Sequence, residues 1–107
     1  MSDEEILEQR RLARLEKSKR DSELMQLHVL AADAMAGSGS QQLRERALSR
    51  VDAWEEKALC SLRYITEWRR MLSLPPPALR QAMLRHDADG AALRQNTPFG
   101  FLMGRQQ

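Results

Sequence analysis

The 107-residue chain is long enough for one domain, and its composition excludes a sheet-based fold. Val, Ile and Thr, the β-branched residues that strands need, total six, whereas the helix formers Leu and Ala total 29. The formal net charge of +2 comes from 17 basic and 15 acidic residues, which is too balanced to identify a partner. We therefore expect an all-α protein with a modest apolar core.

The first predicted element is a long helix over residues 3–36. Ser2 followed by Glu5 matches a capping box at its start, and no Gly or Pro interrupts the helix before Gly37. Residues 16–23 carry no apolar side chain, so only the part of the helix after them is expected to pack on the next helix. Whether the first 20 residues dock on the fold or project from it stays open.

A second helix is predicted over residues 41–73. In the turn before it, Gly37 suits the left-handed position past a helix end, and Ser40 suits the cap of the new helix. No Pro or Gly then follows until Pro75. A short connection between helices of similar length is typical of an antiparallel pair, so residues 1–74 are predicted to form a long, coiled-coil-like helical hairpin.

The second helix carries an apolar stripe whose members alternate in steps of four and three residues. Its eight members are Ala47, Val51, Trp54, Ala58, Ser61, Ile65, Trp68 and Leu72, of which only Ser61 is polar. The apolar part of the first helix, residues 24–36, is too short to cover all of it. The rest must be closed by the C-terminal segment, by the N-terminal segment or by a second chain, and the sequence leaves these alternatives open.

Residues 75–107 are predicted to pack on the hairpin as part of the same domain. The three consecutive prolines 75–77 end the second helix, because Pro lacks the backbone N–H and restricts the residue before it. After them, Leu79 and Met83 at i and i+4 predict a short helix over residues 78–85.

Asp87 or Asp89 can then cap a last short helix. The tail over residues 97–104 is apolar but irregular, and it holds both Phe residues of the chain, Phe99 and Phe101. We expect this tail either to fold back over a Trp or to serve as a docking peptide.

No combination of residues predicts catalysis or a cofactor. His28 and His86 fall in different predicted helices, and Cys60, alone in the chain, can form neither an intramolecular disulfide nor a cysteine metal site. His86, Asp87 and Asp89 have the chemistry of metal ligands, but three adjacent ligands rarely close a site, so we interpret them as a capped turn. We expect a protein that is not an enzyme and binds no cofactor or metal.

The N-terminal sequence Ser2-Asp3-Glu4-Glu5 is acidic, unlike a secretory signal. The apolar runs are much shorter than the about 20 residues of a membrane span. From the sequence we expect a soluble, cytoplasmic protein without a membrane partner.

Basic residues concentrate in the N-terminal part of the first helix. Arg10, Arg14 and Lys17 share one side of that helix, flanked by Arg11 and Arg20. Such a stripe can bind nucleic-acid phosphates, or it can be a solvated face or pair with acids of another chain. No aromatic residue is interleaved to stack on bases, and no helix-turn-helix spacing is visible. The sequence therefore favours the solvated or acid-paired face over nucleic-acid binding.

The incompletely covered apolar stripe predicts a small non-catalytic protein-interaction module, which acts through helix–helix contacts as an adaptor, chaperone-like subunit or regulator and self-associates. Its predicted partner-binding residues are Val51, Trp54, Ile65, Trp68 and Leu72 of the stripe and Phe99 and Phe101 of the tail. The alternative is a nucleic-acid-associated regulator that uses Arg10, Arg11, Arg14, Lys17 and Arg20.

Overall fold

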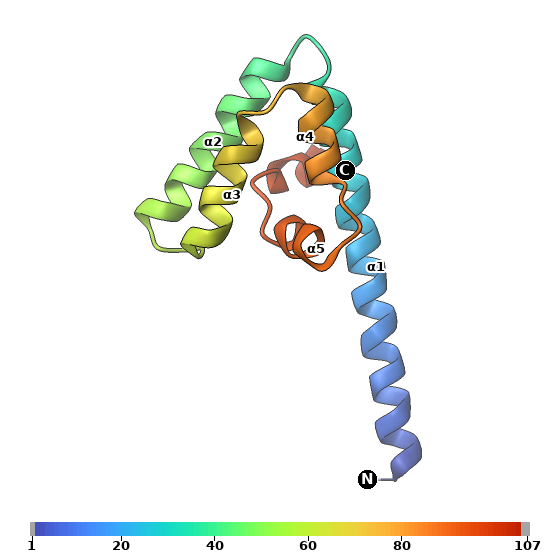
Figure 1. The fold of residues 1–107 in the computed structure, drawn as a ribbon. Helices are drawn as coiled ribbons and strands as arrows, with labels where there is room; N and C mark the ends of the chain where they lie inside the picture. The colour runs from blue at the N-terminus through green and yellow to red at the C-terminus, as the bar shows by residue number, and fades with distance from the viewer. Residues whose placement is uncertain (1, 106–107) are drawn as a thin grey trace.

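The computed structural model describes residues 2–105 and confirms the all-α class. The helices of this part of the chain are α1 (Asp3–Met35), α2 (Ser40–Glu56), α3 (Leu62–Leu72), α4 (Pro76–Met83), α5 (Ala88–Gln95) and the 3₁₀ helix η1 (Gly100–Arg105). Figure 1 shows a folded body around one end of α1, from which the other end of α1 extends alone. This extension raises the radius of gyration to 16.1 Å, above the about 13 Å of a compact domain of this length. Within residues 2–105, no helix is both long and apolar enough to cross a membrane.

Helix α1 has the predicted start and runs unbroken into the body. The backbone N–H of Glu5 donates to Ser2 Oγ at 3.3 Å, which satisfies one of the free donors of the first turn. The buried side of α1 begins at Leu27 and ends at Met35. Residues 3–20 are exposed except for half-buried Ile6, and we call them the arm. At 1.5 Å per residue the arm is about 27 Å long.

The single helix predicted over residues 41–73 is instead two helices, α2 and α3. Helix α2 ends in a Schellman motif, in which the N–H of Leu59 donates to the carbonyl of Trp54 at 2.9 Å and that of Ala58 to the carbonyl of Glu55 at 3.3 Å. Ala58 takes a left-handed backbone conformation, with φ of 54°, at the position that Gly usually occupies. Because an Ala stands there, no Gly or Pro in the sequence marks this helix end.

After this turn, α3 folds back against α2, so that one half of the apolar stripe covers the other. Val51 of α2 and Ile65 of α3 are buried in the same core cluster. At the surface, the Arg69 guanidinium of α3 donates to the carboxylates of Asp52 at 2.8 Å and Glu55 at 3.0 Å, both on α2. Much of the cover that the stripe requires therefore comes from the stripe itself.

Helices α1 and α2 meet at the turn over residues 36–39 and diverge from it, as Figure 1 shows. Helix α4 contacts both α1 and α3, and α5 and η1 contact α1, so the C-terminal segment fills the body between the diverging helices. Gly37 does not take the predicted left-handed conformation. The last turn of α1 instead closes with hydrogen bonds between residues three apart, such as that from the Gly37 N–H to the Ala34 carbonyl at 3.1 Å. Ser40 is the first residue of α2, and the cap position is Gly39.

The triproline begins a helix as well as ending one. Pro76 and Pro77 occupy the first turn of α4, where a backbone N–H has no helical partner to lose, so α4 starts two residues before the predicted residue 78. The tail after α5 is apolar, as predicted, with Pro98 and Phe99 buried and η1 following them.

Helix α5 has its predicted cap, since the Asp87 carboxylate accepts the N–H of Gly90 at 2.7 Å. A Cβ at Gly90 would lie only 2.5 Å from the carbonyl oxygen of Arg85, so the close approach of these segments requires Gly there. The same Arg85 carbonyl accepts the buried Arg94 guanidinium at 2.7 Å, which also reaches the Met83 carbonyl at 2.9 Å. Arg94 thereby satisfies carbonyls that the end of α4 leaves free.

Candidate interaction surface

The apolar residues predicted to bind a partner lie mostly inside the body. Val51, Ile65, Trp68, Leu72 and Phe99 are buried, and Trp54 and Phe101 are half-buried against the same core. Their cover comes from all the helices of the body, including the C-terminal half of α1, and from the tail of the same chain. The structure thus corrects the assignment of the five buried side chains to a partner, since they offer no surface in the folded chain. Trp54 and Phe101 remain partly accessible.

An aromatic cluster holds the tail against α1 and α3. The Trp68 ring stacks on the His28 ring with 5.9 Å between centroids, and Phe99 meets Trp68 edge-on at the same distance. The Trp68 indole Nε1 donates to the carbonyl oxygen of Asn96 at 2.7 Å. Of the two alternatives for the tail, the structure therefore shows the one in which it folds back over a Trp.

His28 is the buried polar centre of this cluster, and no pattern in the sequence indicates this role. Nδ1 lies 2.7 Å from the Leu24 carbonyl oxygen and must donate to it, so Nε2 accepts the Thr97 hydroxyl at 2.8 Å. The Thr97 oxygen in turn accepts the N–H of Phe99 at 3.0 Å. Burial lowers the pKa of His28 to about 4; the Leu24 hydrogen bond opposes this shift, and the charge of Arg94 adds to it. A neutral imidazole with both nitrogens engaged in a closed core is a structural group.

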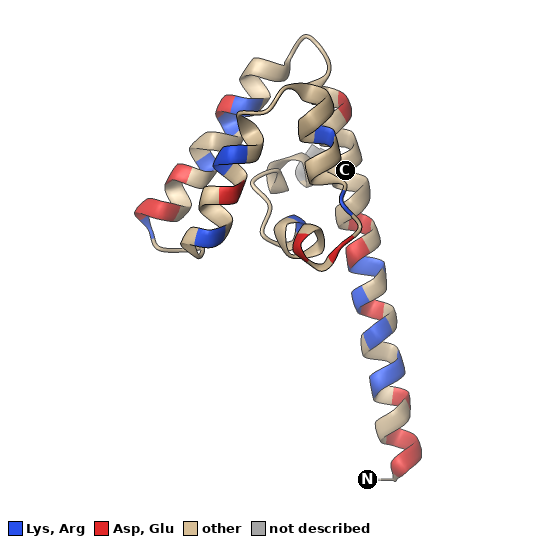
Figure 2. Ribbon diagram, viewed as in Figure 1, with Lys and Arg blue, Asp and Glu red and all other residues tan. Residues whose placement is uncertain are grey.

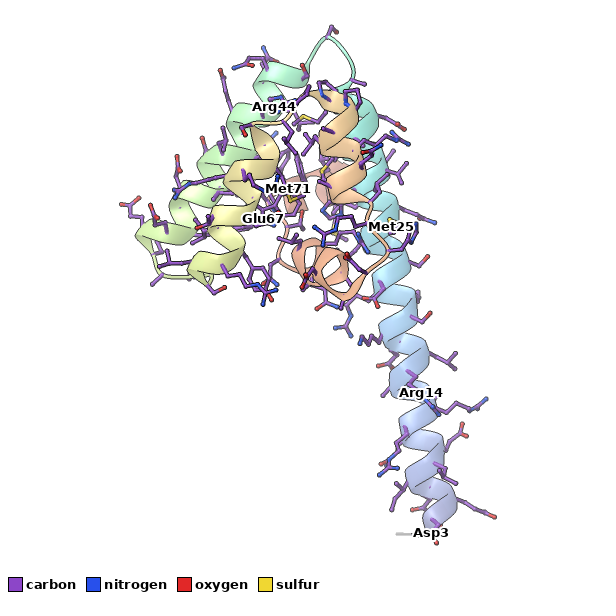
Figure 3. All side chains as sticks on the ribbon, viewed as in Figure 1. Asp3, Arg14, Met25, Arg44, Glu67 and Met71 are labelled. Atoms are coloured by element: carbon purple, nitrogen blue, oxygen red, sulfur yellow. The ribbon has the colours of Figure 1, made fainter. Side chains whose placement is uncertain are left out.

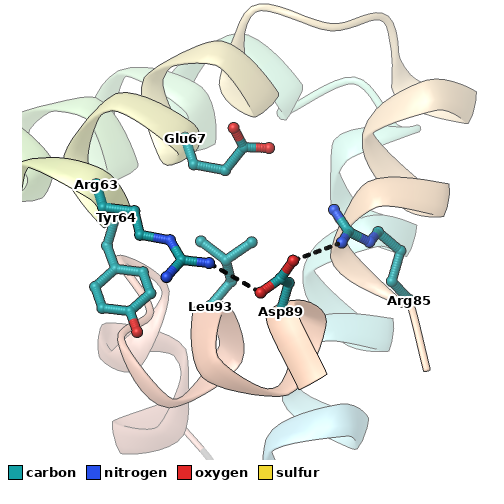
Figure 4. Close-up of a pocket in the computed structure, with 6 residues that line it drawn as sticks. All are labelled: Arg63, Tyr64, Glu67, Arg85, Asp89 and Leu93. Carbon is teal, nitrogen blue, oxygen red and sulfur yellow. Dashed lines mark hydrogen bonds and ion pairs between the residues drawn. The ribbon is translucent and has the colours of Figure 1, made fainter. Parts of the chain in front are cut away.

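A polar pocket between α3 and α5 contains charges that neutralise one another (Figure 4). Asp89 lies between Arg63, at 2.9 Å, and Arg85, at 3.8 Å, while Glu67 occupies the opposite wall. Arg85 also binds Asp87 at 2.9 Å, and the Gly90 N–H together with this guanidinium holds the pKa of Asp87 below its usual range. The lining shows paired ions and no nucleophile beside a base.

In residues 2–105, no three His, Cys, Asp or Glu side chains are grouped so that they could hold a metal ion. The Asp87 carboxylate is engaged in the helix cap and the Arg85 pair described above. These contacts account for the acidic cluster at the start of α5 as a structural turn.

The arm is the exposed part of the fold with the clearest surface pattern. Figure 3 shows its side chains, Asp3 and Arg14 among them, extending from α1 with no other element beside them. Leu7, Leu12 and Leu15 are exposed by 62%, 48% and 56%. Because the arm continues a helix whose other half is anchored in the body, its direction is fixed by that anchor.

The arm has a basic side that we call the inner face, because it continues the buried side of α1. With about 100° of rotation per residue, Arg10, Arg14, Lys17 and Arg20 point in the same general direction as the buried residues of α1. All four are exposed, and none forms an ion pair with another described residue. Arg11 lies on a different side and binds Glu8 at 2.6 Å, so it does not belong to this face.

The other side of α1 carries a mixed row that we call the outer stripe. Its members are Glu8, Leu12, Glu16, Lys19, Glu23, Gln26, Leu30 and Ala34, spaced three or four residues apart, and all are exposed. The outer stripe starts in the arm and continues along the part of α1 on which the body packs. Figure 2 shows the charges along this helix, with acidic residues gathered at its N-terminal end and basic residues following them.

Comparisons with models of known protein families, with curated protein sequences and with solved structures found no match to this chain.

Proposed function

We propose that this chain is a non-catalytic interaction module that presents the arm of α1 to other macromolecules. The observation that carries the proposal is a helix of residues 3–20 on which no segment of the described body packs, with three leucines about half exposed. Helices of this length that lack packing are only marginally stable in water. A partner that covers the arm would bury the leucines and stabilise the helix at the same time.

The proposal keeps helix–helix contact as the mechanism and places it on α1, because the apolar stripe of α2 and α3 is used within the fold. An adaptor, a chaperone-like subunit or a regulator could all work in this way. Catalysis finds no support in the described residues, where the most buried titratable side chain is a hydrogen-bonded structural His28.

Affinity capture with matched leucine variants tests this function. We expect the variant Leu12→Ser with Leu15→Ser to lose protein partners that the unchanged chain retains after nuclease treatment, because Ser cannot replace the apolar surface of Leu. Leu59→Ser with Leu62→Ser is the control, since these leucines lie at the turn between α2 and α3 and are each 68% exposed. Equal capture by both variants would contradict the proposal.

A second candidate function is nucleic-acid binding by the inner face. The observation that favours it is that Arg10, Arg14, Lys17 and Arg20 are aligned, exposed and not ion-paired with described residues. Neighbouring members are about 4.5 to 6 Å apart along the helix axis, so several of them could neutralise phosphates of one nucleic acid at the same time.

Salt-dependent binding to duplex DNA or RNA tests this second candidate. Replacing Arg10, Arg14 and Lys17 together by Ala should reduce the slope of log affinity against log salt by about 3, because each phosphate that a basic side chain neutralises contributes about 0.9. The control variant makes the same charge change on α2 and the turn after it, with Arg46→Ala, Arg50→Ala and Lys57→Ala. Binding that responds equally to both sets would exclude the inner face.

A further inference from the structure

The outer stripe of α1 is self-complementary when two copies of the helix run in opposite directions. If residue 21 of each copy lies at the crossing point, Leu12 of one copy faces Leu30 of the other, and Lys19 faces Glu23. The two-fold axis repeats each pairing, which gives two leucine pairs and two opposite-charge pairs. The exposed fractions of Leu12 and Leu30, 48% and 49%, show that both are available in the single chain.

The rest of the outer stripe is compatible with the same alignment. Glu16 of one copy faces Gln26 of the other, whose amide can donate to the carboxylate. Glu8 faces the small Ala34, which lines a groove between α1, α2 and the tail. The Arg46 guanidinium lies over the Phe101 ring in this groove, 4.2 Å from its centroid.

Charge at the two ends of the pair also favours the antiparallel arrangement. The acidic start of the arm, with Asp3, Glu4 and Glu5 in its first turn, would approach the groove of the second copy, which Arg46 lines. Arg50 lies near the same groove, 5.9 Å from the centroid of the Phe101 ring. Opposite charges brought together in this way orient an interface even where each pair contributes little energy.

We propose that α1 binds α1 of a second copy of this chain in antiparallel orientation through the outer stripe. The proposal rests on the arm as the interaction surface and names its partner. A parallel pair in register would set Lys19 against Lys19 and Glu23 against Glu23, so like charges disfavour that orientation relative to the antiparallel one.

The position of the body permits this pairing. Most of each body packs on the inner side of its own α1, and the members of the outer stripe are all exposed. The tail borders one edge of the stripe, where Met103 lies beside Glu23 and Gln26. The two bodies then lie at opposite ends of the pair, and the second copy would run along the stripe beside Met103. Arg10, Arg14 and Lys17 of both copies stay on the inner faces and remain exposed in the dimer.

Light scattering on the full chain and on charge-reversed variants tests the pairing. We expect the unchanged chain to show twice its mass of 12.3 kDa. Lys19→Glu alone, or Glu23→Lys alone, turns both opposite-charge pairs into repulsions and should weaken the dimer about tenfold. The double variant Lys19→Glu with Glu23→Lys restores opposite charges across the interface and should recover the dimer.

Matched controls separate the interface from effects on folding. Lys17→Glu makes the same charge change on the inner face and should leave the mass unchanged. Leu12→Ser with Leu30→Ser should give a monomer, while Leu59→Ser with Leu62→Ser should not. Because residues 19 and 23 are also neighbours within one helix, circular dichroism of each variant checks that the helix content is retained.

Three outcomes would overturn the proposal: a monomer mass for the unchanged chain, a dimer that ignores the single charge reversals, or a double variant that fails to recover the dimer. A monomer whose captured protein partners still depend on Leu12 and Leu15 would leave the proposed function standing and remove only the second copy as partner. A monomer whose capture ignores these leucines would remove both.

Discussion

The arm and the body both carry many Arg, Leu and acidic residues, but these side chains are paired and buried to different degrees in the two regions. In the body, Arg side chains of one helix bind acids of another, as Arg69 does with Asp52 and Arg80 with Asp33 at 2.7 Å. In the arm, the four basic residues of the inner face have no such partner among the described residues. The body therefore pairs charges between its helices, whereas the arm leaves the basic side chains of its inner face exposed to solvent.

The two regions also differ in what keeps their helices formed. Helices α4 and α5 have eight residues each, too few for stability alone, and they persist because core residues such as Leu79 and Leu93 are buried. The arm is longer than either but has no packing of its own in the described structure. It depends on its continuity with the anchored half of α1, which is why a partner has more to stabilise there.

The difference in packing between the body and the arm is tested most directly by the same substitution, Leu→Ala, made once in each region. Leu79→Ala, at a fully buried position, should lower the free energy of unfolding by about 2–5 kcal/mol through reduced burial and a cavity. Leu7→Ala in the arm should change it by no more than about 0.5 kcal/mol. Urea unfolding of both variants measures the difference, and similar effects would show that the arm packs on the body.

Acidification should lower the folding stability of the body through His28. The unfolded chain takes up a proton at this residue as the pH falls through 6.5, whereas the folded chain does so only near its pKa of about 4. The folding stability present above pH 6.5 should therefore fall by about 3 kcal/mol towards pH 4, at about 1.4 kcal/mol per pH unit. Urea unfolding at several pH values across this range should show that the free energy of unfolding depends less steeply on pH in His28→Gln than in the unchanged chain. An equal pH dependence in the two proteins would contradict the assignment of this effect to His28.

The tight approach at Gly90 is the next test of how closely the body is packed. Gly90→Ala places a Cβ 2.5 Å from the Arg85 carbonyl oxygen, so we expect a decrease of about 1–3 kcal/mol in the free energy of unfolding. Gly100→Ala is the matched control, because nothing lies within 4 Å of a Cβ there. Thermal unfolding of the two variants compares them, and equal stability would mean that the turn has room to relax.

The smallest expected effect is a gain in stability at Ala58. Gly adopts left-handed backbone conformations without the strain that a Cβ introduces, so Ala58→Gly should raise the free energy of unfolding by about 0.5–1 kcal/mol. The same substitution inside α2, Ala53→Gly, should lower it by about 1 kcal/mol. Chemical denaturation measures both changes in the free energy of unfolding. Changes of opposite sign would confirm the turn at Ala58, and a decrease in both variants would favour a continuous helix.

The sequence predicted the helical class, the start of α1, the capped turn before α5 and the basic character of the arm, because composition, caps and charge are local properties. It left open whether the arm docks on the fold or projects from it. It missed the break after α2, since the left-handed position holds Ala58 and not Gly. One signal was present: Ser61, the single polar member of the apolar stripe, stands at the cap position of α3, where Ser is favoured.

The candidate surface could be predicted only in part, for a related reason. The alignment of Arg10, Arg14 and Lys17 follows from helix periodicity, but the side on which they lie relative to the body depends on which residues of α1 are buried. That choice is made by nonlocal interactions such as those of His28 with Trp68 and Thr97. The same aromatic cluster buries Trp68 and Phe99, two of the residues predicted to bind a partner.

The stacking of Trp68 on His28 also gives the protein an intrinsic optical reporter. His28 belongs to the same helix as the arm, so a ligand that displaces or twists α1 changes the surroundings of the Trp68 indole. The chain has only one other Trp, the half-buried Trp54 on α2. In a Trp54→Phe background, the fluorescence of a single buried indole therefore reports movements of the anchored half of α1 without an added label.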